Sequence, residues 1–204
     1  MRLLAFLIFS IPSVAISMSN PEWRISNRRW HGEVYAIIKK IPRNENKIEE
    51  LKKFLSSHQK QSVEYANGGN YRSGQPILIW ACKFKYVSAV KVLLESIEGI
   101  NANAIYRGNT PLIIAIKQRN IKLMDVLLSA SNNAAAVNFS EVRQPIFHAL
   151  VGNCSCNLIQ KLMEYGADFD VRDACGKTPM HVAVESSFPP RAVEIIAQKK
   201  PIVS

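Results

Sequence analysis

Gly176-Lys177-Thr178-Pro179-Met180-His181-Val182-Ala183 is the stretch that decides the fold of this chain. Its pattern returns upstream at residues 74–81, at 108–115 and, in a degenerate form, at 144–149. Every copy ends on an alanine, and the alanines are spaced 34 residues apart (115 − 81, 149 − 115 and 183 − 149): Ala81, Ala115, Ala149 and Ala183. A constant interval of this length indicates one supersecondary unit that is repeated along the chain.

Each unit has the chemistry of a tight turn that leads into a helix. The glycine at the turn permits a positive φ, because it has no Cβ. Thr110 and Thr178 stand where a helix N-cap accepts a free backbone N–H. The proline that follows suits the first helical position, where its missing N–H costs nothing, although Pro76 of the first copy lies one place early. The alanine, one turn further on, lets two helices approach closely.

A second helix is predicted in each unit, because apolar residues recur four apart along it. Rows at i and i + 4 share one helical face, and two such rows keep the interval of the alanines. The first row is Val90, Met124, Leu158 and Ala192, and the second is Leu94, Leu128, Leu162 and Ile196. Lys161 interrupts a third row, so the third unit is the weakest.

Residues 178–183 resemble the Thr-Pro-Leu-His-x-Ala signature of the ankyrin-repeat family, with Met180 in place of leucine. Residues 166–170 are similar to the family's Gly-Ala-Asp-x-Asn turn. The interval also suits the tetratricopeptide repeat, but the tryptophan, the Gly-Tyr pair and the late proline of that pattern do not recur. The resemblance covers about residues 71–200 and implies an all-α solenoid of helix-turn-helix units.

The predicted boundaries follow from these phases. The units are placed at residues 71–104, 105–138, 139–172 and 173–204. Their helix pairs are expected at 77–86 with 87–97, 111–118 with 121–130, 145–151 with 157–165, and 179–186 with 190–198. No polar capping repeat follows the fourth unit, so its last helix is expected to be the least stable part.

The residues before the repeats divide into a leader and a cap. Residues 1–19 combine a positive start with an apolar run and small residues at Ala15 and Ser17, which favours a cleaved secretory signal and a secreted or periplasmic location. An uncleaved anchor and a buried N-terminal helix are the alternatives. Residues 20–70 are predicted to be an N-terminal helical cap, with helices over 32–38 and 47–55, Asn46 as an N-cap, and a loop over 56–73.

No motif of a metalloprotease, a phosphate-binding loop or a serine hydrolase is present, so we expect neither enzymatic activity nor a cofactor. An enzyme with its chemistry in residues 20–70 is the alternative, although that segment lacks a nucleophile–base pair. His181 fills the family's own histidine position, which implies a structural role. Cys82 shares the phase of buried apolar positions. Export would permit a disulfide from Cys154 or Cys156 to Cys175, but free thiols are expected.

The net charge of +10 is divided between +6 in residues 1–60 and +4 in residues 61–204. This balance is mild for a nucleic-acid-binding protein, and no interleaving of aromatic and basic residues marks a stacking platform. It favours an acidic protein surface as partner, or an anionic lipid, through long-range attraction. A membrane role is expected only through an uncleaved leader, and no small-molecule substrate is expected.

The family resemblance implies that partners meet the turn tips and the exposed side of each first helix. Carried over by phase, the expected contact residues are Arg72, Gln75, Lys83, Phe84, Tyr106, Arg107, Asn109, Lys117, Gln118, Arg143 and Lys177. Because the first two units hold the aromatic and basic members, we predict a basic groove there. The expected function is an exported protein-binding module, with a secreted effector as one form of it. A structural or chaperone-like partner of another exported protein is the alternative.

Overall fold

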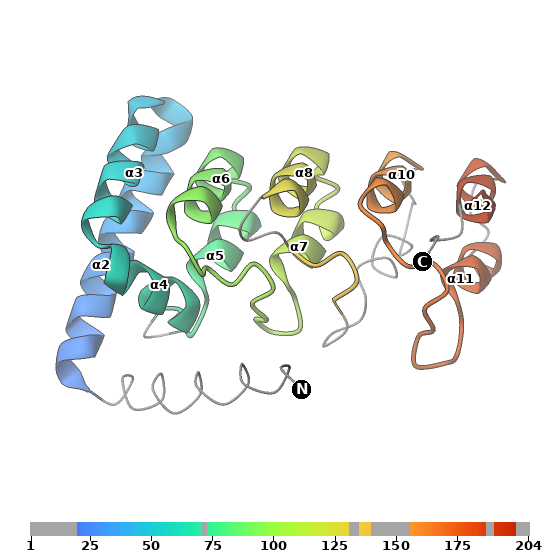
Figure 1. Ribbon diagram of the computed structural model, residues 1–204, viewed down its shortest axis with the longest axis horizontal. Coiled ribbons are helices and arrows are strands. Elements are labelled where there is room, and N and C mark those ends of the chain that lie inside the picture. Colours follow the sequence, from blue (N-terminus) through green and yellow to red (C-terminus); the bar gives the residue numbers. More distant parts are fainter. Residues whose placement is uncertain (1–19, 71–72, 131–134, 140–155, 187–189, 199–204) are drawn as a thin grey trace, which may run out of the picture.

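The chain folds as a row of two-helix layers behind a cap of longer helices (Figure 1). The computed structural model describes residues 20–70, 73–130, 135–139, 156–186 and 190–198. The elements are α2 (Pro21–Lys40), η1 (Ile41–Arg43), α3 (Asn46–Ser57), α4 (Gln59–Gly68), α5 (Ile77–Lys83), α6 (Val87–Ser96), α7 (Pro111–Lys117), α8 (Ile121–Ser129), α10 (Cys156–Glu164), α11 (Pro179–Glu185) and α12 (Pro190–Ala197). No strand occurs in these ranges, so the all-α class is confirmed.

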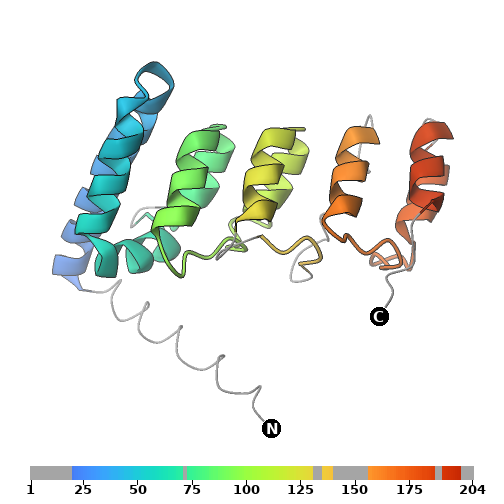
Figure 2. The same cartoon turned by 45° about the horizontal axis from the view of Figure 1, so that its top comes forward.

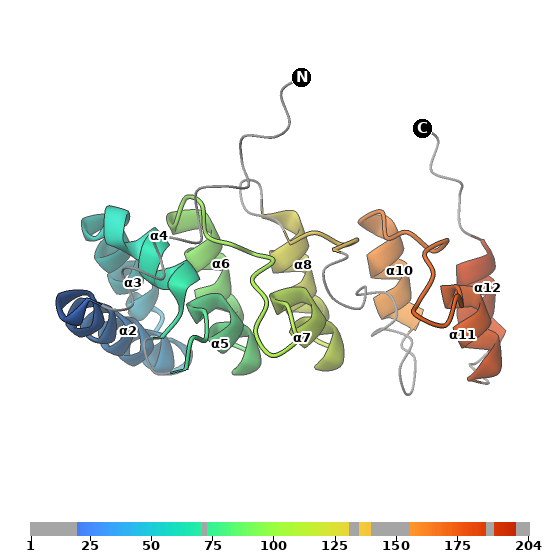
Figure 3. The ribbon, with the colours of Figure 1, turned by 90° about the horizontal axis from the view of Figure 1, so that it is seen from below.

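The helices stack in two rows. The second helices α6, α8, α10 and α12 stand side by side, and α3 of the cap continues their row (Figure 2). The first helices α5 and α7 pack together in the other row, and α11 belongs to it at the far end (Figure 3). This arrangement is the predicted solenoid of helix-turn-helix layers.

Small residues lie at the seams of the stack, as the interval predicted. Ala81, Ala115 and Ala183 have no exposed surface, whereas Ala149 lies outside the described residues. Both predicted rows of the second helices are buried, with no member more than 8% exposed. A continuous apolar core therefore runs from the cap to the last unit.

Local chemistry starts the first helices where the sequence indicated. The Thr110 hydroxyl accepts the N–H of Ile113 (3.2 Å) at the start of α7. Thr178 forms a capping box with His181, whose Nδ1 lies 2.6 Å from the threonine hydroxyl. His181 therefore has a structural role, because it helps to cap the helix in which it lies. The first of these helices, α5, ends at Lys83 and not at residue 86, because Lys85 turns the chain with a φ of 60°.

The cap departs from the sequence prediction in two places. Helix α2 begins at Pro21 rather than at residue 32, because the side chain of Asn20 caps it by accepting the N–H of Glu22 (2.9 Å). Residues 56–73 are not one loop, because α4 occupies Gln59–Gly68 and buries Tyr65 and Ala66 against the core. Asn46 is not an N-cap. It donates its N–H to Asn44 Oδ1 (3.0 Å).

Three asparagine side chains bond successive layers, and the sequence analysis missed all of them. Asn67 of the cap donates to the Gly99 carbonyl (2.9 Å) and accepts the N–H of Asn101 (2.7 Å). Further along, Asn103 accepts the N–H of Ala136, and Asn138 bonds the backbone of residues 166 and 168. We call Asn67, Asn103 and Asn138 the asparagine ladder, because the side chain of each bonds to the backbone of the loop that follows the next layer.

The outer face of the fourth unit is partly polar. His181 is exposed there, at the position that Ile79 and Ile113 fill, almost fully buried, in the first two units. Val184 is the apolar exception, with 61% of its surface exposed. Among the described residues, no helix is long and apolar enough to cross a membrane.

Candidate functional site

The turn tip between the first two units is a tight hairpin. Tyr106 and Asn109 exchange both backbone hydrogen bonds (3.0 and 3.1 Å), while Arg107 and Gly108 have φ angles of 51° and 71°. Positive φ at both central residues defines a type I′ turn. Within it, the Arg107 guanidinium lies 5.3 Å from the centre of the Tyr106 ring, a cation–π distance. The tip therefore holds one aromatic and one cationic side chain together.

A hollow of about 320 Å³ lies between this tip and helices α5 and α7. We call it the tip-side hollow; its lining consists of Gln75, Ile79, Lys83, Tyr106, Arg107, Asn109, Ile114, Lys117 and Gln118. All of these except Ile79 and Ile114 belong to the predicted contact set. The two isoleucines were missed because their positions predict core packing, and Ile79 is indeed only 1% exposed. They give the hollow an apolar part beneath a polar and cationic rim.

The rim of the hollow has an excess of positive charge. Lys83, Arg107 and Lys117 all line it, and no aspartate or glutamate does. None of the ion pairs found in the described part of the chain involves these cations. The Lys117 ammonium donates to Asn109 Oδ1 (2.6 Å), which leaves its charge uncompensated. Such a site attracts an anion.

The fourth unit shows the contrast. Two repeat intervals on, Lys177 and Glu185 occupy the positions of Asn109 and Lys117. There the lysine ammonium lies 2.5 Å from the glutamate carboxylate, so the equivalent contact is an internal ion pair. That hydrogen-bonded carboxylate raises the pKa of Lys177. Lys177, although predicted as a contact residue, lies far from the tip-side hollow and has its own counter-ion.

Gln118 has a structural role in addition to its place in the lining. Its amide nitrogen donates to the carbonyls of Cys82 (3.2 Å) and Lys83 (3.0 Å) at the end of α5. These bonds tie the second unit to the first and fix the side chain. Its Oε1 is buried and lacks a hydrogen-bond partner. Gln118 therefore positions α5 against α7 beneath the rim.

Phe84 lies beside the hollow instead of lining it. It is 52% exposed, and its ring is 5.2 Å from Trp80 and 6.2 Å from Tyr86. The ring centroid of Trp80 in turn lies 4.3 Å from that of Tyr35 in the cap, a residue that the sequence analysis did not select. We call Tyr35, Trp80, Phe84 and Tyr86 the aromatic patch. The remaining predicted contact residues, Arg72 and Arg143, lie outside the described residues.

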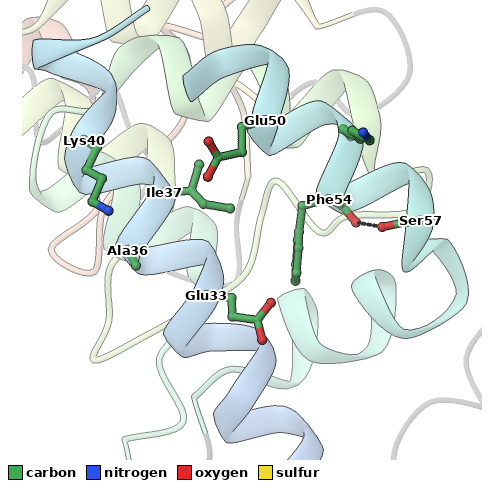
Figure 4. Close-up of a pocket in the computed structure, with 8 residues that line it drawn as sticks. Glu33, Ala36, Ile37, Lys40, Glu50, Phe54 and Ser57 are labelled. Atoms are coloured by element: carbon green, nitrogen blue, oxygen red, sulfur yellow. Dashed lines mark hydrogen bonds between the residues drawn. The ribbon is translucent and has the colours of Figure 1, made fainter. Parts of the chain in front are cut away.

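A second groove of about 430 Å³ lies in the cap, between α2 and α3 (Figure 4). Ile37 and Phe54 lie between the two helices, with Glu33 and Lys40 along α2 and Glu50 on α3. Its acids are already paired, Glu33 with Arg29 (3.0 Å) and Glu50 with Lys47. This groove carries both signs of charge, so its electrostatics select no class of partner.

The histidines, cysteines and acids are the side chains that could hold a metal ion. Within the described residues they form no cluster that could do so. Cys82, Cys156 and Cys175 are free thiols, so no disulfide joins the last two, and Cys154 lies outside the described residues. Burial raises the pKa of the Cys82 thiol, which keeps it protonated and inert.

Comparisons with known proteins agree with this architecture. Residues 42–139 match the family model described as ankyrin repeats (3 copies), a range that includes α3 and α4 of the cap. The chain is 33% identical over 113 residues to a putative ankyrin repeat protein, FPV031, of fowlpox virus, covering 53% of this chain and 33% of the viral protein. It is 32% identical over 93 residues to NF-kappa-B inhibitor alpha of Gallus gallus, covering 45% of this chain and 29% of that one.

Solved structures show the same fold. The ankyrin repeat protein EF0377 has a TM-score of 0.62 at 20% identity, with 80% of each chain covered. The ankyrin repeat domain of Bcl-3 has a TM-score of 0.60 at 16% identity, covering 94% of this chain and 86% of that one. The chain spans a third or less of the length of the curated relatives named here.

Proposed function

The chain belongs to the ankyrin-repeat family, and from this premise we propose that it is an exported module that binds an acidic protein partner at the tip-side hollow. Ankyrin repeats present a rigid, extended surface on which partners bind, so a protein–protein interaction role follows from the fold. The family leaves the partner open, and the partner's chemistry has to come from the site itself.

One observation carries the proposal: Lys83, Arg107 and Lys117 surround one hollow without a carboxylate, whereas the matching contact in the fourth unit is an internal ion pair. Three uncompensated cations attract anionic surfaces over distances of about a Debye length, ~8–10 Å at physiological salt. Tyr106 and Arg107 are also of the residue types enriched in binding hot spots. An acidic protein face satisfies both features.

Charge reversal tests the proposal. Lys83→Glu, Arg107→Glu and Lys117→Glu together should abolish capture of the partner in a pull-down from the native compartment, and added salt should weaken capture by the native chain. The matched control makes the same change in net charge on another face, through Lys52→Glu, Lys53→Glu and Lys91→Glu. Capture that survives the first triple variant as well as the second would discard the hollow as the site.

Export rests on the composition of residues 1–19, which combine a basic start, an apolar run and small residues. N-terminal sequencing of the protein recovered outside the cytoplasm should begin after Ala15 or Ser17. A retained Met1 would instead favour an uncleaved anchor. A secreted-effector role requires further that the captured partner belongs to another organism, which identification of the captured protein by mass spectrometry decides.

A further inference from the structure

The aromatic patch is an exposed apolar surface that the proposed function does not use. Its rings follow one another at centroid distances of 4.3 Å (Tyr35–Trp80), 5.2 Å (Trp80–Phe84) and 5.5 Å (Trp80–Tyr86). Phe84 is one of four large apolar residues that are exposed in the described part of the chain. The other rings of the patch, those of Tyr35, Trp80 and Tyr86, are half-buried. A gathered aromatic surface of this kind marks a contact site rather than scattered exposure.

The patch and the tip-side hollow are neighbours on one helix. Ile79 and Lys83, four residues apart on α5, line the hollow, and the next residues along, Trp80 and Phe84, form the patch. Residues four apart lie on one helical face, so the hollow and the patch lie on neighbouring faces at the end of α5. A ligand that lies across α5 therefore meets cations on one side and aromatic rings on the other.

Resting on the proposed function, we propose that the partner segment is an acidic peptide stretch with a bulky apolar or aromatic side chain. Its carboxylates enter the hollow toward Lys83, Arg107 and Lys117, and its apolar side chain packs on Phe84, the exposed ring of the aromatic patch. The aromatic contact adds to the ionic one, because an exposed ion pair alone contributes little to binding, whereas a desolvated aromatic contact contributes much of the energy of a hot spot.

Single-stranded nucleic acid is also drawn to cations and aromatic rings, but the geometry here favours a peptide. Stacking platforms present ring faces to the bases. The rings of Trp80 instead lie close to those of Tyr35, Tyr86 and Phe84, at interplanar angles of 35–48°, so the neighbouring rings occupy the space around it. The hollow, with its apolar part at Ile79 and Ile114, has the volume for a side chain.

A random dodecapeptide library displayed on phage tests the proposal directly. The native chain should enrich peptides in which Asp or Glu adjoins Trp, Phe, Tyr or Leu. Phe84→Gln, which installs the residue that the second unit has at this position, should remove the aromatic enrichment and keep the acidic one. Ile25→Gln, at a residue 69% exposed on α2, is the matched control and should change neither.

A synthetic peptide of the enriched sequence then gives the magnitude. Fluorescence anisotropy should show that Phe84→Gln weakens its binding by about tenfold, as expected for loss of one hot-spot aromatic. The same peptide with its aromatic residue replaced by serine should bind the native chain and the variant equally. Equal weakening of both peptides, or none, would overturn the inference.

The outcomes separate this inference from the proposed function. Acidic enrichment without aromatic residues defeats the inference and leaves the acidic-partner proposal standing. Enrichment without acidic residues, or no enrichment, defeats both. Tighter binding of a labelled oligo-dT that is lost in Phe84→Gln would overturn the peptide assignment in favour of nucleic acid.

Discussion

His31 shows how one buried side chain couples the stability of the cap to pH. It has no exposed surface, its Nδ1 lies 3.0 Å from the Asn27 carbonyl, and its Nε2 is buried without a partner. Desolvation lowers its pKa from 6.5 to about 4, and the bond to Asn27 opposes this shift. The neutral ring therefore fits the fold, whereas the imidazolium does not.

The sign of the pH dependence follows from linkage. Because the pKa of His31 is lower in the folded chain, the unfolded chain binds the extra proton between pH 6.5 and about 4. The stabilisation is complete above pH 6.5 and is lost as the pH falls to 4, by about 3 kcal/mol. Urea unfolding between pH 6.5 and 4 should show this fall in the free energy of unfolding, and the fall should be absent in His31→Phe. His58→Gln, which alters the histidine at the end of α3, should retain the pH dependence of the native chain. An unchanged pH dependence in His31→Phe would show that His31 is not its source.

Single residues were readable from the sequence where a local spacing fixes their role. Thr110 and Thr178 stand directly before a proline and a helix, so their capping could be predicted. Gln118 stands at a position that was predicted to face a partner, and nothing local reveals that its amide bonds α5 in the preceding unit. Long-range side-chain bonds of this kind depend on the finished stack.

At the scale of elements, the helices of the units that the structure describes were predictable and those of the cap only partly so, while the helix predicted at 145–151 lies outside the described residues. The buried face of α2 includes Asn27 and His31 beside Trp23 and Trp30, so two of its seven buried residues are polar in the sequence. Apolar periodicity therefore underestimates this helix. Asn67-Gly68-Gly69-Asn70 suggested a long loop, whereas it only ends α4, with Gly69 at a φ of 73°.

The turn between the two helices of a unit offers an element-scale prediction. Lys85 and Arg119 lie one repeat interval apart and have φ angles of 60° and 52°. A left-handed backbone conformation costs a non-glycine residue ~1 kcal/mol of folding free energy, and glycine avoids this cost. Glycine also makes the unfolded chain more flexible, which offsets part of the gain in stability. Arg119→Gly should therefore raise the free energy of unfolding by about 0.5 kcal/mol. Lys122→Gly, three residues on in α8, should lower it by about 1 kcal/mol; destabilisation by both would contradict the strain argument.

For the whole molecule, the interval of the alanines predicted the seams, but the asparagine ladder escaped notice. Ala81, Ala115 and Ala183 lie in helices of seven residues each, and all four alanines keep a strict interval of 34 residues in the sequence. The ladder residues lie in or beside loops, with spacings of 36 and 35 (103 − 67 and 138 − 103), so no fixed period reveals them. Seven of the nine residues that line the tip-side hollow were among the predicted contact residues for the same reason as the seams, because they keep the phase of the units.

The first residue of the asparagine ladder joins the cap to the repeats, and a substitution of Asn67 tests this joint. Asn67→Ala removes both bonds to the loop after α6, which should cost about 1–2 kcal/mol. Because each layer of a solenoid is held by its neighbours, hydrogen exchange should quicken in α2–α4 more than in α7 and α8. Asn101→Ala, which removes only the local bond to Asn103 N–H, is the matched control. If exchange rises equally in the cap and in α7–α8, the coupling is global and Asn67 does not form a separate joint.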